Sequence, residues 1–99
     1  MSEKVLVVVP AWNEQASIAK VISELKTRGF DVLVVDDGST DKTSFIARQN
    51  GAITIRLPFN LGVGGALRCG FKYAVQHGYQ AVVQCDADGQ HPVDHIELL

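Results

Sequence analysis

The chain has 99 residues, of which 46% are hydrophobic and 20% are charged, and its formal net charge is −2 at pH 7. This length accommodates at most one domain, and the composition is that of a globular protein, which excludes disordered and fibrous classes. The charge provides no basic surface for nucleic acid, so we expect no nucleic-acid partner. Cys69 and Cys85 follow no secretory signal, and the five apolar residues at 5–9 are too few to span a membrane, so we expect a reducing, cytoplasmic setting.

Four apolar segments are expected to form strands. Residues 5–9 and 32–35 are largely β-branched runs without polar alternation, which is typical of strands covered on both faces, and residues 81–83 have the same character. Residues 52–56 alternate and form a shorter strand, as at a sheet edge. Pro10 is expected to end the first strand.

Two helices are expected between the first three strands. The first opens at Asn13 and Glu14, and its apolar residues recur at helical spacing, at Ile18, Val21, Ile22 and Leu25. The second runs from about 42 to 49 and is expected to be capped by Ser39, Thr40 and Asp41.

Two further helices are expected in the second half of the chain. One follows an irregular, Gly-rich loop at 57–65, and its apolar face contains Leu67, Phe71, Ala74 and Val75. The other is expected to begin at Val93, after Pro92, and to reach Leu99.

This alternation predicts an α/β fold, with a Rossmann-like, mostly parallel sheet and helices on both faces. The final helix is short, and the fourth strand would lie at an edge of the sheet. We therefore expect residues 1–99 to be the N-terminal half of a larger domain, and an incomplete sheet of this kind favours a homo-oligomer.

Carboxylates follow the fourth strand. Asp86 and Asp88 are two residues apart, so on extended backbone both side chains project to the same side. Oxygen ligands favour Mg²⁺ or Mn²⁺, and Gln90 supplies a further oxygen at the next alternate position. Such a cation would neutralise a diphosphate. The alternative is that Asp88 and Gly89 form an ordinary surface turn.

Acidic residues also follow the first two strands, at the same expected edge of the sheet. Asp37 is suited to accept hydrogen bonds from ribose hydroxyls or from a nucleobase N–H. Glu14 could contact a nucleoside, or could favour the start of its helix through the helix dipole.

The Gly-rich loop matches neither the dinucleotide-binding fingerprint nor the phosphate loop. Leu67 stands where the first motif needs a third glycine, and Gly70 is followed by Phe71 and Lys72 where the second needs Lys and then Ser or Thr. Gly64 could instead bring the backbone close to a ligand at a helix N-terminus, with Arg68 one turn later as a phosphate partner. A tight contact between helix and sheet, permitted by small residues, explains the glycines equally well.

Four segments of the sequence contain recognisable motifs. They are VVPAWNE at 8–14, VVDDGSTD at 34–41, NLGVGGA at 60–66 and DADGQHP at 86–92. In this order they resemble the successive motifs of family 2 glycosyltransferases with the GT-A fold, most closely the polyprenyl-phosphate (dolichol-phosphate type) mannosyl- and glucosyltransferases. The resemblance covers essentially the whole chain.

The resemblance implies an inverting hexosyltransferase that uses a UDP- or GDP-sugar and a divalent metal, Mg²⁺ or Mn²⁺. It implies a lipid-phosphate acceptor at the cytoplasmic face of the membrane. Residues lining the nucleoside pocket would be Pro10, Ala11, Glu14 and Asp37. Residues holding the metal and the diphosphate would be Asp86, Asp88 and Gln90.

The family domain continues for about as many residues again, and any catalytic base would lie beyond Leu99. We therefore expect residues 1–99 to form the donor-binding half of the domain and to have little transferase activity alone. Two alternatives remain: a non-catalytic nucleotide-binding module, and a flavodoxin-like or receiver-type regulatory domain. The second would need an acid pair after the first strand, where Pro10, Ala11 and Trp12 stand.

Overall fold

A computed structural model describes residues 4–89 and 95–98 of the chain. Strands and helices alternate through most of it. In chain order they are β1 (Val5–Ala11), α1 (Ile18–Thr27), β2 (Asp31–Asp36), α2 (Thr43–Gln49), β3 (Ile53–Arg56), α3 (Val63–Gln76), β4 (Ala81–Gln84) and β5 (His95–Leu98). The sheet order is β3-β2-β1-β4-β5, with four parallel strands and β5 antiparallel to β4. The predicted α/β fold with a mostly parallel sheet is confirmed.

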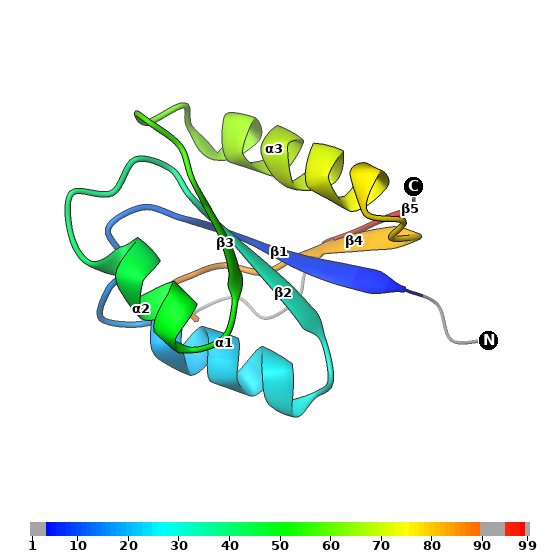
Figure 1. Ribbon diagram of the computed structural model, residues 1–99, viewed down its shortest axis with the longest axis horizontal. Helices are drawn as coiled ribbons and strands as arrows, with labels where there is room; N and C mark the ends of the chain where they lie inside the picture. Colours follow the sequence, from blue (N-terminus) through cyan, green and yellow to red (C-terminus); the bar gives the residue numbers. More distant parts are fainter. Residues whose placement is uncertain (1–3, 90–94, 99) are drawn as a thin grey trace.

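Helices cover both faces of the sheet, as predicted (Figure 1). On one face, α1 and α2 bury Ile18, Ile22 and Ala47 against alternate residues of β1 and β2, including Val7 and Val34. On the other face, α3 packs over the remaining strand residues. Successive residues of a strand point to opposite faces, so a continuous apolar run is what a doubly covered strand requires.

The predicted apolar face of α1 is confirmed, because Ile18, Val21, Ile22 and Leu25 are all buried. The predicted face of α3 is partly wrong, since Val75 is 64% exposed.

The residues of α3 that are buried against the sheet are small: Ala66, Gly70 and Ala74. A Cβ atom at Gly70 would lie 2.6 Å from Cγ1 of Val8. The helix therefore approaches β1 more closely than any side chain at position 70 would permit.

Pro10 does not end β1, which continues through it to Ala11. The carbonyl of Val8 accepts a hydrogen bond from the amide of Cys85, so the backbone groups of Pro10, two residues later, face the same side as those of Val8. The pairing with β4 ends at Val8 and Gln84, and a missing N–H at Pro10 therefore leaves no ladder bond unmade.

The predicted final helix is wrong over residues 95–98, which form β5; Pro92, Val93, Asp94 and Leu99 lie outside the described residues. The sequence of this segment alternates polar and apolar residues, a strand pattern. Its pairing with β4 also means that β4 is not an edge strand. The backbone groups of β4 thus find partners on both sides.

The sheet reverses its strand order beside β1. The chain moves outward from β1 to β2 and β3, and α3 then carries it to β4 on the opposite side of β1. In open α/β sheets ligands bind at such a reversal, outside the carboxyl ends of the strands. Within the part of the chain that the structure describes, no helix has the length and apolarity needed to cross a membrane.

Candidate donor-binding site

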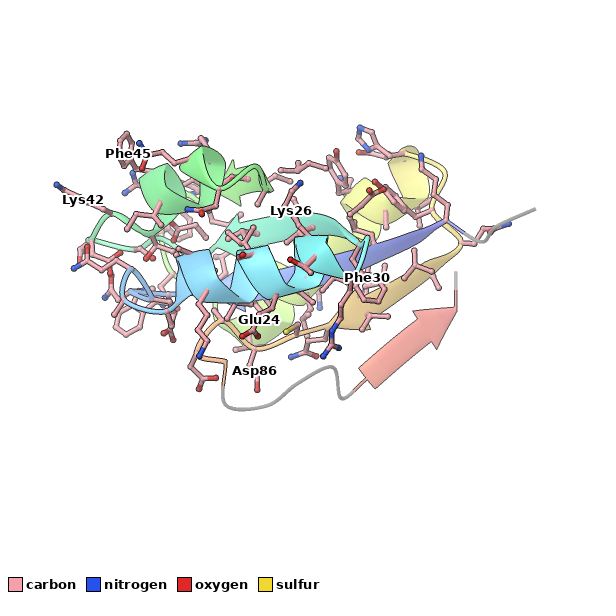
Figure 2. The ribbon with its side chains drawn as sticks, turned by 90° about the horizontal axis from the view of Figure 1, so that it is seen from below. Glu24, Lys26, Phe30, Lys42, Phe45 and Asp86 are labelled. Atoms are coloured by element: carbon pink, nitrogen blue, oxygen red, sulfur yellow. The ribbon has the colours of Figure 1, made fainter. Side chains whose placement is uncertain are left out.

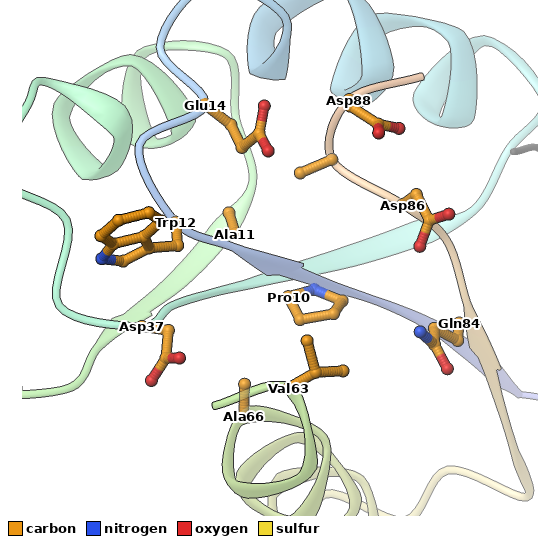
Figure 3. Close-up of a pocket in the computed structure, with 11 residues that line it drawn as sticks. Pro10, Ala11, Trp12, Glu14, Asp37, Val63, Ala66, Gln84, Asp86 and Asp88 are labelled. Atoms are coloured by element: carbon orange, nitrogen blue, oxygen red, sulfur yellow. The ribbon is translucent and has the colours of Figure 1, made fainter. Parts of the chain in front are cut away.

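A pocket of about 320 Å³ lies at the carboxyl ends of β1, β2 and β4. Its lining comes from these three strand ends and from the start of α3: Pro10, Ala11, Trp12, Glu14, Asp37, Val63, Ala66, Gln84, Asp86, Ala87 and Asp88. The volume falls in the range of small-molecule sites. Trp12 and Asp37 lie on one side of this pocket, and Asp86 and Asp88 lie on the other (Figure 3).

The acidic segment after β4 is a turn rather than extended backbone. The strand ends at Gln84, and the amide of Gly89 donates to the carbonyl of Asp86 over 3.4 Å. Asp86 and Asp88 nonetheless line the same pocket, with Ala87 buried between them. The predicted turn and the predicted convergence of the two acids therefore coexist.

Two carboxylates are a small ligand set for a metal. Among the described residues, no group of three or more His, Cys, Asp or Glu side chains is arranged to hold a metal ion. Gln90, the third predicted ligand, lies outside the described residues. Carboxylate oxygens suit Mg²⁺ or Mn²⁺, which proteins often bind through one or two carboxylates together with phosphates of the substrate.

Asp37 connects the end of β2 to the start of α3. Its side chain is 5% exposed, and its two carboxylate oxygens accept hydrogen bonds from the amides of Leu61 (2.7 Å) and Gly62 (2.8 Å). Its own amide donates to the carbonyl of Ala11. A carboxylate oxygen has more than one lone pair, so Asp37 retains acceptor capacity on its pocket side.

The loop after β1 is held by the loop after β2. Asn13 has a left-handed backbone (φ 52°); its amide donates to Oγ of Ser39 (2.8 Å), and its Oδ1 accepts from the amide of Thr40 (2.9 Å). The prediction that Ser39 and Thr40 cap α2 is therefore wrong. Their partners are 26 and 27 residues away in the sequence, in the segment that carries Trp12.

Asp41, the third predicted cap, does act at the start of α2. It accepts hydrogen bonds from the amide and the hydroxyl of Thr43, and from the amide of Gln15. Burial alone would raise the pKa of the Asp41 carboxyl, but these hydrogen bonds outweigh it, and the pKa lies below its usual range.

Glu14 both lines the pocket and adjoins the start of α1. Its backbone carbonyl accepts from the amides of Ser17 and Ile18, and its Oε2 lies 3.2 Å from the hydroxyl of Ser17. The two predicted roles, contact with a nucleoside and support of the helix, are thus compatible in space.

Two predicted site residues lie outside this lining. Gly64 is in the first turn of α3 with open space where a Cβ would stand, and Arg68 is exposed one turn later. Among the described residues, no lysine or arginine lines the pocket, which instead carries four carboxylates, those of Glu14, Asp37, Asp86 and Asp88. The pocket is therefore strongly electronegative.

Sequence reasoning missed several lining residues, of which Trp12 and Gln84 carry the most chemistry. Trp12 is 52% exposed although it is a large apolar side chain. Its position between Ala11 and Glu14, both predicted to line the pocket, was a usable signal. Gln84 is the polar last residue of an otherwise apolar strand, and this placement marks a strand end that faces a ligand.

Comparison with known proteins identifies relatives of the whole segment. A family model described as Glycosyl transferase family 2 matches residues 6–99. The UDP-N-acetylglucosamine–dolichyl-phosphate N-acetylglucosaminyltransferase of Methanococcus voltae is 35% identical, over 97% of this chain and 46% of the relative. The undecaprenyl-phosphate mannosyltransferase of Micrococcus luteus is 33% identical, over 97% of this chain and 42% of the relative. The chain thus spans less than half the length of these relatives.

Solved structures agree with the fold. Glucosyl-3-phosphoglycerate synthase from Mycobacterium tuberculosis, in complex with UDP, matches with a TM-score of 0.74 and 31% identity, over 92% of this chain and 36% of that chain. Another crystal structure of that protein, with a TM-score of 0.73, contains Mn²⁺, UDP-glucose and phosphoglyceric acid. The predicted GT-A fold is confirmed.

Proposed function

The chain belongs to glycosyl transferase family 2, and we propose that it carries the donor site of an enzyme that transfers a hexose from a UDP- or GDP-sugar to a polyprenyl phosphate, with inversion. Support for this proposal comes chiefly from one observation. The pocket joins an aromatic side chain at one end to a pair of carboxylates at the other. A nucleotide-diphosphate sugar has matching ends, a flat base and a diphosphate.

The end with Trp12 and Asp37 suits a nucleoside. An exposed indole offers a stacking surface for a base. The buried Asp37 carboxylate is fixed by two backbone amides, so it is preorganised to accept a further hydrogen bond from a base N–H or a ribose hydroxyl. Pro10 and Ala11 line the pocket between the two ends.

The end with Asp86 and Asp88 needs a cation if it is to meet a diphosphate. Within the described part of the chain, four carboxylates and no basic residue line the pocket, so an anionic donor would be repelled unless a divalent ion bound with it. The oxygen donor set fits Mg²⁺ or Mn²⁺, with Asp86, Asp88 and Gln90 as the proposed holders and phosphate oxygens completing the coordination. Once bound, such an ion stabilises the charge on the departing nucleotide diphosphate.

The proposed acceptor follows from the named relatives, which act on dolichyl phosphate and undecaprenyl phosphate. In a single displacement, an oxygen of the acceptor phosphate forms a bond to C1 of the sugar while the bond from C1 to the diphosphate oxygen breaks. Because that nucleophile is already anionic, the reaction needs little help from a general base. A lipid acceptor would place the reaction at the cytoplasmic face of the membrane.

Binding of nucleotides to the chain tests the donor site directly. Trp12 is the single tryptophan of the 99 residues, so tryptophan fluorescence reports on the pocket without a signal from a second tryptophan. We expect UDP or GDP to change this fluorescence in the presence of Mn²⁺ and to have little effect without it, while AMP has little effect in either case. Failure of every nucleotide to bind would overturn the proposal.

A transfer assay tests the reaction. The protein, in the length in which it is expressed naturally, is incubated with Mn²⁺, labelled UDP- and GDP-sugars and a short polyprenyl phosphate. The expected product is a lipid-linked hexose whose anomeric configuration is opposite to that of the donor. Metal-dependent binding without transfer would instead favour the non-catalytic nucleotide-binding module.

A further inference from the structure

Helix α1 begins with a serine whose side chain does not cap the helix. Ser17 occupies the N-cap position and makes no side-chain hydrogen bond to the first turn. A serine in this position usually accepts such a bond, which stabilises a helix by about 1 kcal/mol. The Ser17 hydroxyl instead donates to the carbonyl of Ala87 over 2.7 Å, a contact between residues 70 positions apart.

The contact falls at the centre of the acidic turn, because Ala87 separates Asp86 from Asp88 and is itself 4% exposed. One helical turn after Ser17, Val21 belongs to the same cluster of buried hydrophobic residues as Ala87. The acidic turn is thus joined to α1 by this hydrogen bond and by the shared core. Figure 3 shows the Asp88 segment running beside this helix.

The same hydroxyl adjoins a second wall of the pocket. Oε2 of Glu14 lies 3.2 Å from Oγ of Ser17, whereas the carbonyl of Ala87 is closer. A hydroxyl has one proton, and the shorter distance favours the carbonyl of Ala87 as its acceptor. Ser17 therefore joins the loop after β1 to the turn after β4.

We propose that Ser17 is a positioning residue for the divalent cation, a role that rests on the proposed function. Two neighbouring carboxylates repel each other when no cation lies between them, which favours turning one of them away. By fixing the carbonyl of Ala87, Ser17 holds the backbone of the turn in the conformation in which both Asp86 and Asp88 line the pocket. The cost of arranging the ligands is thereby met before the cation binds.

The test is Mn²⁺ affinity, measured from the loss of the free-Mn²⁺ EPR signal with and without UDP. Ser17→Ala removes one hydrogen bond, and we expect Mn²⁺ binding to weaken about three- to tenfold. Ser17→Thr keeps the hydroxyl and is expected to bind Mn²⁺ as the unmodified chain does. Ser17→Cys keeps the shape with a weaker donor, so it should also weaken binding and serves if the alanine variant does not fold.

Ser23→Ala is the matched control, since Ser23 is exposed on the same helix and its hydroxyl makes no contact with the pocket. A purely structural role for Ser17 predicts a lower melting temperature with unchanged Mn²⁺ affinity in the folded variants, and that result would overturn the inference. If the unmodified chain binds neither Mn²⁺ nor UDP, the proposed function fails instead. The two failures are therefore distinguishable.

Discussion

The carboxylate of Asp37 accepts a hydrogen bond of 2.8 Å from the backbone amide of Gly62, the N-cap residue of α3. The second carboxylate oxygen accepts from the next amide back along the chain, so both oxygens are engaged by a single loop. This arrangement fixes the end of β2 to the start of α3, and these two elements contribute Asp37, Val63 and Ala66 to the pocket. Asp37 therefore acts on the shape of the site as well as on its chemistry.

Asp37→Asn is predicted to destabilise the chain. Asparagine has only one acceptor oxygen, so its NH₂ group would face one of the two backbone N–H groups and that charge-assisted hydrogen bond would be lost. The side chain is too buried for water to compensate. We expect the free energy of unfolding, measured with urea, to fall by about 1–3 kcal/mol. Glu24→Gln, on the exposed surface of α1 (Figure 2), is the control and should be neutral. A stability within about 0.5 kcal/mol of the unmodified chain would contradict the assigned hydrogen bonds.

Removal of either acid in the turn after β4 is predicted to weaken Mn²⁺ binding. Asp86 and Asp88 are the two proposed metal ligands among the described residues. Asp86→Asn or Asp88→Asn therefore removes half of the negative charge that the pair offers to the cation. We expect a loss of about tenfold or more in Mn²⁺ affinity, measured by calorimetry. Asp31→Asn, at the opposite end of β2, changes the net charge equally and should have little effect.

Mn²⁺ and the nucleotide are also predicted to strengthen each other's binding. Phosphate oxygens would complete a coordination sphere that the protein leaves largely open, and thermodynamic linkage requires the effect to be mutual. The checking measurement is Mn²⁺ affinity at zero and at saturating UDP, together with UDP affinity at zero and at saturating Mn²⁺. An Mn²⁺ affinity that UDP leaves unchanged, together with a UDP affinity that Mn²⁺ leaves unchanged, would argue against a shared site.

Trp12→Ala is predicted to weaken nucleotide binding about 5- to 150-fold, because stacking of a base on an aromatic side chain contributes about 1–3 kcal/mol. Trp12→Phe keeps an aromatic face and should retain most of the affinity. Phe45→Ala removes another exposed aromatic, from α2, and is the control. Because both Trp12 variants lack the fluorescent tryptophan, affinity is measured by calorimetry for all three variants. A tryptophan that only covers the pocket mouth would give equal losses for alanine and phenylalanine.

The fold was predictable from sequence where the determinants are local. The spacing of Ile18, Val21, Ile22 and Leu25 specifies the buried stripe of α1, and the unbroken apolar runs specify strands covered on both faces. Asp37, Asp86 and Asp88 could be placed at one sheet edge because parallel strands share a direction. These inferences needed no knowledge of side-chain packing.

The failures involve contacts between distant residues. The hydrogen bonds between Asn13 and Ser39 and between Ser17 and Ala87 correspond to no periodic pattern in the sequence. From sequence, Ser39 therefore resembles an ordinary helix cap. The strand at 95–98 depends on the free edge of β4, and a proline just before it suggested a helix instead. The small residues of α3 gave no sign that Gly70, rather than Val75, faces the sheet.

Asp41 is predicted to make stability depend on pH. Its pKa is lowered in the folded chain, so the ionised carboxylate contributes stability above its pKa in the unfolded chain, about 3.9, and that contribution is lost as the pH falls through the folded value. Asp41→Asn should be less stable than the unmodified chain at pH 7, and the difference should shrink at about pH 3. Urea unfolding at the two pH values provides the check. A difference that is the same at both would mean that the charge is unimportant.

Gly70→Ala is predicted to destabilise the chain, although alanine favours a helix by about 1 kcal/mol. The added Cβ would meet Cγ1 of Val8 at 2.6 Å and Cγ2 at 2.9 Å, and Val8 is fully buried. Overpacking of this kind costs about 1–3 kcal/mol.

Two further comparisons separate this contact from a general effect of glycine in α3. Gly64→Ala adds a Cβ in the same helix where nothing lies within 4 Å, so it should raise stability by about 0.5–1 kcal/mol. In a Val8→Ala background, the two Cγ atoms that a Cβ at position 70 would meet most closely are gone, and only Cβ of residue 8, at 3.3 Å, remains near it. The helix preference of alanine should then prevail, and Gly70→Ala should become neutral or stabilising. Urea unfolding of the four chains in this cycle gives the coupling energy, expected above about 1 kcal/mol. A coupling energy near zero would show that α3 has room to move away from β1 at Gly70.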